Sequence, residues 1–335
     1  MLNDILSDGF YQHYILTPPD NSNDEVFFTL WDYRRLQKLW AKENGLSEEA
    51  TLNDIRIAQI RHFNADVVFD FSPFRDLEFI EQARAEIANQ NMLYLCWNAY
   101  IKDHAMTFPQ YDAHVSLHQP YVDYWRQLKL HAYEMQPGVP KDWSDDAQGG
   151  ERTIDILFYG QYLDNVFKNR RELINTLLDY RKASNKVVDV HLQILPKADT
   201  SAIERNLSAV KEPIFGSELY GKIRQAKVVV NICTDFNESH KSNARVFEAL
   251  GNGALLIAEA GSYPMGLVAG EDFIVYNDMA ELPALLDKVF SNWDDYKKVA
   301  LRGHQKVHDY YGRPQQWQVF SSIVEDLRLK VASDD

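Results

Sequence analysis

The residue types with the clearest potential for ligand chemistry lie together in residues 242–253, which read Ser-Asn-Ala-Arg-Val-Phe-Glu-Ala-Leu-Gly-Asn-Gly. Their spacing predicts a short helix that follows the N-cap candidate Ser242 and stops at the glycines. A helix start offers unpaired N–H groups and a positive dipole end, so it can hold a phosphate. Asn243 lies in the first turn, Arg245 would add a charged fork, and Glu248 could accept hydrogen bonds from sugar hydroxyls. Phosphate and hydroxyls side by side indicate a nucleotide or a nucleotide sugar.

A structural explanation of the same stretch is also open. In a capped core helix, Phe247 and Leu250 would pack inward. Arg245 and Glu248 would then form a surface ion pair, which contributes only about 0–1 kcal/mol. A charged hydrogen bond from Arg245 to a diphosphate would contribute about 1.5–3 kcal/mol. The spacing alone does not decide between the two interpretations.

A second pattern suited to phosphate binding precedes this stretch. An apolar run at residues 153–159 ends at Gly160, and a helix is predicted to begin near Arg170 and Arg171. A glycine directly after a strand lets a ligand approach the backbone closely. An arginine at a helix start is unfavourable for the dipole unless an anion lies near. Gly160 and Arg170 are therefore candidate ligand-binding residues, although an ordinary tight turn would explain the glycine equally well.

Composition limits the class of protein. The chain has 335 residues, of which 45% are hydrophobic and 13% aromatic. This length and composition suit two domains with substantial cores and argue against disorder. The formal net charge of −14 argues against a nucleic-acid partner, because a phosphate backbone requires a basic face. A local basic pocket for a small phosphate ligand is compatible with this charge.

The cysteines and the apolar runs bear on the compartment. Cys96 and Cys233 are the only cysteines and lie inside apolar runs, as expected for buried free thiols in a reducing compartment. No apolar run approaches the ~20 residues needed to span a bilayer, and the acidic start of the chain lacks the basic region of a signal peptide. We therefore expect a cytoplasmic protein without a transmembrane segment; peripheral membrane contact is open.

Strand-like and helix-like segments alternate along the chain, which indicates α/β units around mostly parallel sheets. The strand-like runs are continuously apolar, as in strands covered on both faces. They are residues 66–71, 92–97, 153–159, 187–195, 227–233, 254–260 and 272–276. Helical patterns are expected at residues 76–90, 171–182, 218–225, 243–250, 281–290, 294–311 and 314–331.

Proline, glycine and aspartate are dense between residues 135 and 152, which is typical of a linker. We therefore expect an N-terminal domain at residues 1–136, a linker at 137–151 and a second domain at 152–311. Two α/β domains joined in this way would form a cleft lined by the carboxyl ends of their strands, where such sheets bind ligands. No glycine-rich first strand precedes Asp66, so we expect the N-terminal domain to be trimmed or modified.

The C-terminal half resembles the donor-binding domain of GT-B glycosyltransferases. Arg245, Phe247, Glu248 and Gly253 match, one by one, the pattern Arg-x-Phe-Glu-x-x-x-x-Gly of the CgeB-like, spore-maturation-type group, which is similar to the glycosyl transferases group 1 family. The resemblance covers most of residues 30–325. It also includes residues 36–45, 137–140, 155–160, 170–171, 227–233 and 272–311.

This resemblance implies the GT-B fold, with two Rossmann-like domains facing a central cleft, and sugar transfer from a nucleotide-diphosphate sugar to a glycan or glycoconjugate. It implies that Glu248 holds ribose or sugar hydroxyls, and that Arg245 and the helix start hold the diphosphate. Gly160 would lie where the backbone approaches the phosphates or the acceptor. The last helix, in residues 312–335, would cross back to the N-terminal domain. His240 stands where many retaining members carry a second glutamate, so retaining and inverting chemistry both stay open.

An inverting enzyme would need a general base near the acceptor hydroxyl, and the strand ends of the N-terminal half supply candidates. Asp70 and His118 are the candidate catalytic residues, while Asn98 could only orient a substrate. The neighbours Asp103 and His104 are a further possibility. Each has a structural alternative: Asp70 could cap the next turn, and His118 could be a satisfied, half-buried histidine.

No metal and no cofactor are expected. The sequence contains no Asp-x-Asp triplet, no His-Glu-x-x-His and no Cys-x-x-Cys. Arginine, lysine and helix dipoles can stabilise a leaving diphosphate without a cation. The expected partners are a nucleotide sugar and a carbohydrate-type acceptor, and the oligomeric state is open. Two alternative functions are a GT-B-fold nucleotide-sugar epimerase and a non-catalytic partner subunit of another glycosyltransferase.

Overall fold

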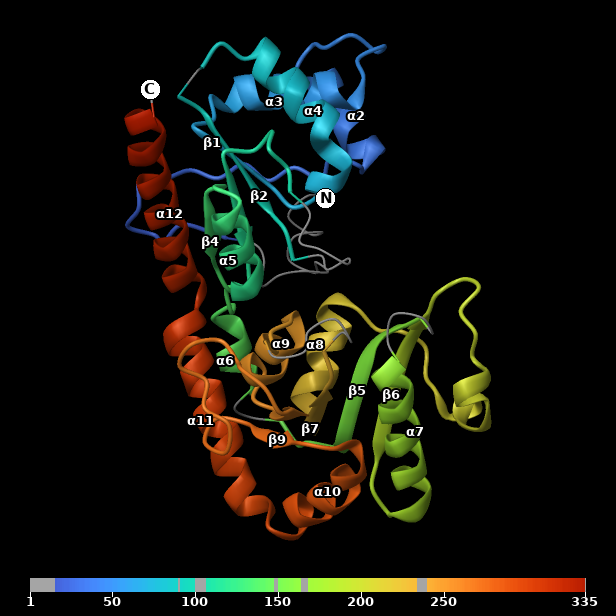
Figure 1. The fold of residues 1–335 in the computed structure, drawn as a ribbon. Coiled ribbons are helices and arrows are strands. Elements are labelled where there is room, and N and C mark those ends of the chain that lie inside the picture. Colours follow the sequence, from blue (N-terminus) through green and yellow to red (C-terminus); the bar gives the residue numbers. More distant parts are fainter. Residues whose placement is uncertain are drawn as a thin grey trace. The chain divides into compact units, whose positions relative to one another are not determined.

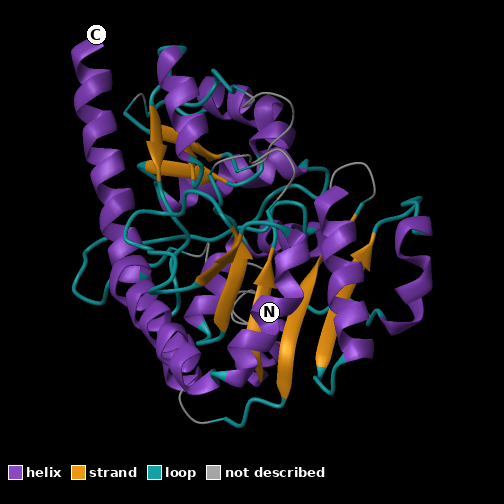
Figure 2. Ribbon diagram, turned by 60° about the horizontal axis from the view of Figure 1, so that its bottom comes forward, coloured by secondary structure: helices purple, strands orange, loops and turns teal. Residues whose placement is uncertain are grey.

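The computed structural model of the protein describes residues 16–89, 91–99, 107–147, 150–163, 168–233 and 240–334. The chain forms two compact units. Residues 137–316 make up the C-terminal unit, and residues 17–136 together with 317–335 make up the N-terminal unit. Each unit contains one parallel sheet with helices packed against it (Figures 1 and 2), so the predicted α/β class is confirmed. Within the described ranges, every helix is too short or too polar to cross a membrane.

The sheet of the N-terminal unit has four parallel strands in the order in which they occur in the chain. They are β1 (Val67–Asp70), β2 (Leu93–Trp97), β3 (Ala113–Ser116) and β4 (Ala132–Glu134). The helices before and between them are α2 (Arg34–Glu43), α3 (Leu52–Phe63), α4 (Pro73–Glu86) and α5 (Gln119–Gln127). The sequence predicted β1 and β2 but not β4, because Ala-Tyr-Glu is too short and too polar to form an apolar run.

One face of this sheet is covered by the helices that connect its strands. Val68 packs in a cluster with Phe79 of α4, and Ala132 packs in a cluster with Trp125 of α5. Side chains alternate between the two faces of a strand. The residues next to Val68 and Ala132 in these strands therefore point to the opposite face of the sheet, where another element must pack against them.

The opposite face is covered by the last helix, α12 (Arg313–Asp334). The ring centroids of Phe69 and Phe320 are 5.1 Å apart. The hydroxyl of Tyr133 donates to Asp326 Oδ2 at 2.7 Å. Residues 317–335 therefore complete the unit that begins at residue 17.

The sheet of the C-terminal unit has five parallel strands in the order β6-β5-β7-β8-β9. They are β5 (Ile154–Tyr162), β6 (Val188–Ile194), β7 (Ala226–Asn231), β8 (Leu255–Glu259) and β9 (Ile274–Tyr276). The larger helices are α7 (Lys168–Ala183), α8 (Gly216–Gln225), α9 (Ala244–Gly251), α10 (Leu282–Ser291) and α11 (Trp293–Tyr311). The short elements are α6 (Asp142–Ala147) and the 3₁₀ helices η2 (Ser201–Ala209) and η3 (Met279–Glu281).

Helices cover both faces of this second sheet. Phe158 belongs to a core cluster formed with α7 and α10, whereas Tyr159 belongs to a cluster formed with α8, α9 and α11. The strand order changes direction between β5 and β7. In open α/β sheets such a switch point leaves a crevice at the carboxyl ends of the strands.

The segment that we expected to be a linker contributes to the C-terminal core. Val139 and Trp143 are each only 1% exposed. A Cβ atom on Gly251 would lie 2.8 Å from the Trp143 ring and 2.9 Å from a methyl group of Val139. Val139 and Trp143 of this segment therefore pack tightly into the core of the C-terminal unit.

Helix α11 approaches the loop before β9 and helix α9 closely at Gly303. A Cβ atom there would lie 2.1 Å from the backbone oxygen of Asp272 and 2.8 Å from a methyl group of Leu250. The backbone oxygen cannot move aside cheaply, because it belongs to the chain leading into β9. Only glycine fits this contact without displacing α11.

Gly303→Ala is therefore expected to destabilise the protein by about 1–3 kcal/mol, the usual cost of overpacking. Gly221→Ala is the matched control, because Gly221 lies in α8 and a methyl group added to it would have no atom within 4 Å. This control should be neutral or stabilising by up to about 1 kcal/mol. Thermal unfolding followed by circular dichroism measures both, and equal effects of the two substitutions would contradict the packing argument.

Candidate functional site

Helix α9 begins beside the carboxyl end of β7. Asn243 is its N-cap, since its side-chain oxygen accepts from the N–H of Val246 at 3.3 Å. Its amide nitrogen donates to Asn231 Oδ1 at 3.1 Å and so ties the helix start to the strand. The prediction of Ser242 as the N-cap is wrong by one position; Ser242 lies fully buried just before the cap.

Arg245 and Glu248 do not form an exposed ion pair. Their exposed fractions are 8% and 7%, and every residue of α9 after Ala244 is buried. The structural explanation based on a surface pair is therefore wrong. Both charged side chains point into the unit, where each must be stabilised by specific neighbours.

The guanidinium of Arg245 is held by neutral groups. Nη1 donates to Asn231 Oδ1 at 2.7 Å, and Nη2 donates to the backbone oxygen of Tyr159. The guanidinium carbon lies 4.8 Å from the centroid of the Tyr159 ring. Among the described residues, Nε has no hydrogen-bond partner, and no carboxylate lies within ion-pair distance of Arg245. A buried cation of this kind can accommodate an anion from outside the chain.

A second guanidinium reaches the same place. Arg170, near the start of α7, is 6% exposed, and its Nη1 donates to the backbone oxygen of Gln161 at 2.6 Å. A Cβ atom on Gly160 would lie 2.8 Å from Nη2 of Arg245 and 3.5 Å from Nη1 of Arg170. Glycine at this position therefore leaves the space in which the two guanidinium groups come together.

Glu248 is paired with a tyrosine. Its Oε2 accepts from the hydroxyl of Tyr159 at 2.7 Å. Burial raises the pKa of Glu248, while the hydrogen bond from Tyr159 and the charge of Arg245 act in the opposite direction. Burial and the neighbouring Glu248 raise the pKa of Tyr159 well above its usual value, so this hydroxyl remains a donor.

An ion pair borders the site at the end of β8. Lys241 Nζ lies 2.7 Å from Glu259 Oε1, and the N–H of Cys233 donates to the same carboxylate oxygen at 3.1 Å. Burial raises the pKa of the Cys233 thiol to about 12. Cys233 is therefore a neutral packing residue, as its apolar surroundings in the sequence predicted.

Helix α9 is also fixed at its far end. His304 and His308 of α11 form hydrogen bonds through Nδ1 and Nε2 with the backbone oxygens of Leu250 and Gly251, at 2.9 and 3.0 Å. These carbonyls have no partner inside the helix. A helix of two turns is thus held at both ends, which fixes the positions of Arg245 and Glu248.

These residues lie where the strand order of the C-terminal sheet changes direction. Gly160 follows Tyr159 in β5, Asn231 ends β7, and α9 supplies Arg245 and Glu248 (β5, β7 and α9 are labelled in Figure 1). The structure thus brings together five of the residues that the sequence predicted, Gly160, Arg170, Asn243, Arg245 and Glu248. Tyr159 and Asn231 were missed, although each is a polar group near the end of an apolar run.

In the N-terminal unit, the candidate base Asp70 ends β1 and is 7% exposed. Its two carboxylate oxygens accept from the N–H of Ser72 at 2.8 Å and from the hydroxyl of Tyr111. Burial, followed by the charge of Asp76, raises the pKa of Asp70 to about 6. Asp70 therefore stabilises the turn before α4, as the structural alternative proposed, and also has the raised pKa that suits a general base.

The other candidates follow the neighbouring strands. Asn98 follows β2 and is 4% exposed; His118 precedes the first residue of α5 and is 5% exposed. The ring of His118 meets that of Tyr121 edge-on, with centroids 5.3 Å apart. Asp103 and His104 lie outside the described residues.

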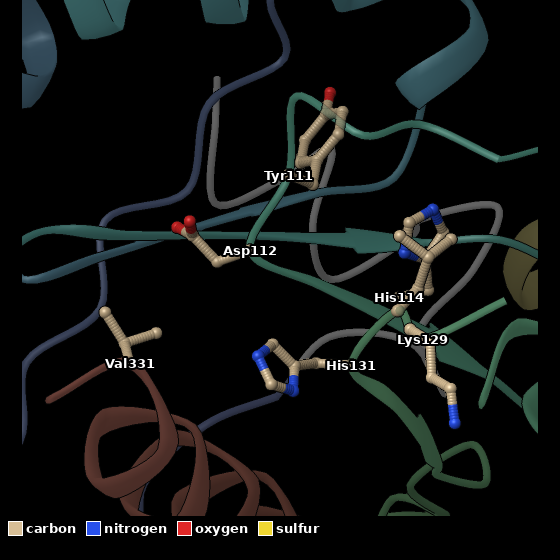
Figure 3. Close-up of a pocket in the computed structure, with 7 residues that line it drawn as sticks. Tyr111, Asp112, His114, Lys129, His131 and Val331 are labelled. Carbon is tan, nitrogen blue, oxygen red and sulfur yellow. The ribbon is translucent and has the colours of Figure 1, made fainter. Parts of the chain in front are cut away.

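A pocket of about 280 Å³ opens at the amino ends of β3 and β4. It is lined by Tyr111, Asp112, His114, Lys129, Leu130, His131 and Val331. Figure 3 shows the Tyr111 hydroxyl turned away from the other lining side chains. Burial lowers the pKa of His114 to about 4, so this ring is neutral at neutral pH. The pocket contains none of the predicted site residues.

Over the described ranges, no three His, Cys, Asp or Glu side chains are grouped closely enough to hold a metal ion. The cations that converge on Gly160 are instead arginine side chains. The arrangement at α9 is therefore chemically suited to an anion such as a phosphate.

Comparisons with known proteins bear on the family and the fold. Residues 181–319 match the family described as "Glycosyl transferase-like". No curated protein matches the chain significantly. The family match includes α9, β7 and β8, and therefore most of the site described above.

Solved structures are similar over most of the chain. HepE from Anabaena, in complex with UDP and glucose, has a TM-score of 0.57 at 10% identity over 81% of this chain and 81% of its own. Sucrose-phosphate synthase from Thermosynechococcus elongatus has a TM-score of 0.55 at 12% identity over 93% and 87%. A TarM variant from S. aureus has a TM-score of 0.57 at 10% identity over 82% and 59%. The fold is thus the GT-B fold, as predicted, and the family match and the fold together support a glycosyltransferase.

Asp70→Asn is expected to flatten the dependence of stability on pH in the acid range. The pKa of Asp70 is raised from 3.8 to about 6, so between these values the folded protein binds a proton that the unfolded chain has lost. The free energy of unfolding should therefore fall as pH rises through this window, by on the order of 3 kcal/mol at 1.4 kcal/mol per unit. An asparagine cannot titrate, so the variant should lose this fall.

Urea unfolding at about pH 4 and pH 7 measures the difference. Asp66→Asn, at the exposed residue just before the same strand, is the control and should keep the wild-type difference. The argument fails if Asp70→Asn and the wild type lose equal stability between the two pH values.

Proposed function

We propose that the protein transfers a sugar from a nucleotide-diphosphate sugar to a carbohydrate-type acceptor, and that its C-terminal unit binds the donor. The observation that carries this proposal is the buried Arg245 guanidinium, held by neutral groups at the switch point of the sheet. HepE, in complex with UDP and glucose and with UDP-glucose, supports the choice of ligand. TarM, in complex with UDP, supports it as well.

In this proposal the diphosphate lies against Arg245, Arg170 and the backbone at Gly160, beside the N-terminus of α9. The dipole of α9 and the two guanidinium groups attract the same anion. Glu248 accepts hydrogen bonds from ribose or sugar hydroxyls. Ser242 and Asn243 hold the helix start in place for these contacts.

We further propose that transfer needs no metal ion. Negative charge develops on the diphosphate as the bond to the sugar breaks, and fixed cations placed beside it stabilise this charge. The guanidinium groups of Arg170 and Arg245 both approach Gly160, beside the proposed diphosphate position. The charge that a divalent cation would supply can therefore come from side chains.

The acceptor-side chemistry is assigned to the N-terminal unit. Asp70, with a pKa of about 6, is the proposed general base if transfer inverts the sugar, and His118 is the second candidate. The motif around Arg245 favours a CgeB-like enzyme acting on a glycan or glycoconjugate. The two buried free thiols support a reducing compartment such as the cytoplasm.

Arg245→Gln is expected to weaken nucleotide binding about 10- to 100-fold, the equivalent of one charged hydrogen-bond network. Thermal shift and calorimetry with UDP, GDP, ADP and UDP-glucose measure this. Arg181→Gln, on the exposed end of α7, is the control and should bind like the wild type. If no nucleotide or nucleotide sugar binds the wild type at millimolar concentration, the proposed function is wrong.

Chelation of divalent cations should leave binding and turnover intact. Nucleotide affinity and release of nucleoside diphosphate from the donor are measured in EDTA and again with added Mg²⁺ or Mn²⁺. The expected change is less than about twofold, since the arginines supply the charge. A dependence of turnover on the added cation by more than about tenfold would contradict metal independence.

A further inference from the structure

We propose that Tyr159 is a positioning residue that orients Glu248 for hydrogen bonding to the hydroxyls of a nucleoside diphosphate, while its backbone separately holds Arg245. This inference rests on the proposed function, because it assigns a role within the same donor site. Tyr159 was assigned no role from the sequence, although the residue lies in the stretch 155–160 that carries part of the resemblance. The residue stands out only through its contacts, which reach both proposed ligand-binding side chains of α9.

Three parts of Tyr159 make three different contacts. Its backbone oxygen accepts from Arg245 Nη2. Its ring lies under the guanidinium, with 4.8 Å between the guanidinium carbon and the ring centroid. Its hydroxyl donates to Glu248 Oε2 at 2.7 Å. The tyrosine is 7% exposed, so none of these contacts competes strongly with water.

The alternation of strand β5 explains why Tyr159 supplies the hydroxyl beside α9, while the ring centroid of its neighbour Phe158 lies 5.3 Å from the guanidinium carbon of Arg245. Phe158 points into the core cluster with α7 and α10, whereas Tyr159 points towards α8 and α9. Gly160 follows directly and leaves room for the guanidinium groups. Strand geometry thus places a hydroxyl donor beside the carboxyl group of α9 and an empty space beside the arginines.

The hydroxyl matters because Glu248 must stay an acceptor. A carboxylate accepts hydrogen bonds from hydroxyls, whereas a protonated carboxyl group also presents a donor. Tyr159 from β5 and Arg245 from its own helix both favour the charged form of Glu248 against the effect of burial. Tyr220 of α8 contributes to the raised pKa of Tyr159.

Removal of the Tyr159 hydroxyl should therefore change the pKa of Glu248 in a direction that can be tested. Tyr159→Phe keeps the ring and the backbone oxygen and deletes only the contact to Glu248. The pKa of Glu248 should rise further. As the pH is lowered, Glu248 is then protonated earlier, so nucleotide affinity begins to fall at a higher pH than in the wild type. Contacts of Arg245 with phosphate should persist, since they depend on the backbone oxygen and the ring.

The experiment compares affinity for inorganic pyrophosphate with affinity for whichever of UDP, GDP or ADP binds the wild type best. Tyr159→Phe should weaken the nucleoside diphosphate about 5- to 10-fold near neutral pH and pyrophosphate by less than about twofold. In this variant, the fall of nucleotide affinity on the acid side of the pH profile should begin at a higher pH than in the wild type. Tyr162→Phe is the matched control, because Tyr162 lies on the same strand, is fully buried and donates to the backbone oxygen of Asp199 at 3.0 Å, away from the site.

Glu248→Gln provides a second, independent variant, because its amide oxygen can still accept from Tyr159. It cannot titrate, so the affinity for the nucleotide relative to pyrophosphate, in which titration of the terminal phosphates at about pH 6 largely cancels, should no longer fall on the acid side. The inference is overturned if both variants keep the wild-type dependence of nucleotide affinity on pH. It is also overturned if Tyr159→Phe weakens pyrophosphate and nucleotide equally. Either result would leave the proposed function standing. Failure of every nucleotide to bind the wild type would instead overturn the proposed function and this inference with it.

Discussion

The guanidinium of Arg245, buried without a carboxylate partner among the described residues, is the constraint around which the C-terminal unit is arranged. Its donors meet an amide oxygen and a backbone oxygen, which solvate the positive charge without cancelling it. A carboxylate in the same place would stabilise the unliganded protein more and attract an anion less. The neighbouring features follow from this: a glycine where a Cβ would collide with the guanidinium, a tyrosine ring beneath it, and a short helix fixed at both ends.

The two sheets position their polar edges in different ways. In the C-terminal unit, the change of strand order between β5 and β7 separates neighbouring connections and leaves their carboxyl ends accessible. In the N-terminal unit, the strands keep their chain order, and polar residues such as Asp70, Asn98 and His118 follow three successive strands at one edge. Asp70 is stabilised there by Tyr111 in much the same way as Glu248 is by Tyr159. In both units a tyrosine hydroxyl faces a buried carboxyl group.

The sequence could predict what repeats along the chain or stands at a fixed spacing. Apolar runs located most strands, and the spacing within residues 242–253 located α9 with Arg245 and Glu248. It could not predict the N-cap, because Ser242 and Asn243 are both good capping residues and only the contact with Asn231 selects Asn243. It could not show that the proline- and glycine-rich segment near residue 140 is packed, because the burial of Trp143 depends on Gly251, more than a hundred residues later. Tyr159 escaped notice for a similar reason, since its partners come from α9.

The contact of α12 with the first sheet has a consequence for the order in which the chain can fold. The N-terminal sheet leaves the ribosome first, with one face covered by its own connecting helices. Its other face, with Phe69 and Tyr133, is covered by Phe320 and Asp326, which follow the whole C-terminal unit in the chain. The C-terminal unit, complete by residue 316, can therefore finish its core while the earlier sheet is still open on one side. Synthesis of α12, and not emergence of the first strands, therefore completes the N-terminal unit, and its sheet is exposed on one face while the C-terminal unit is being made.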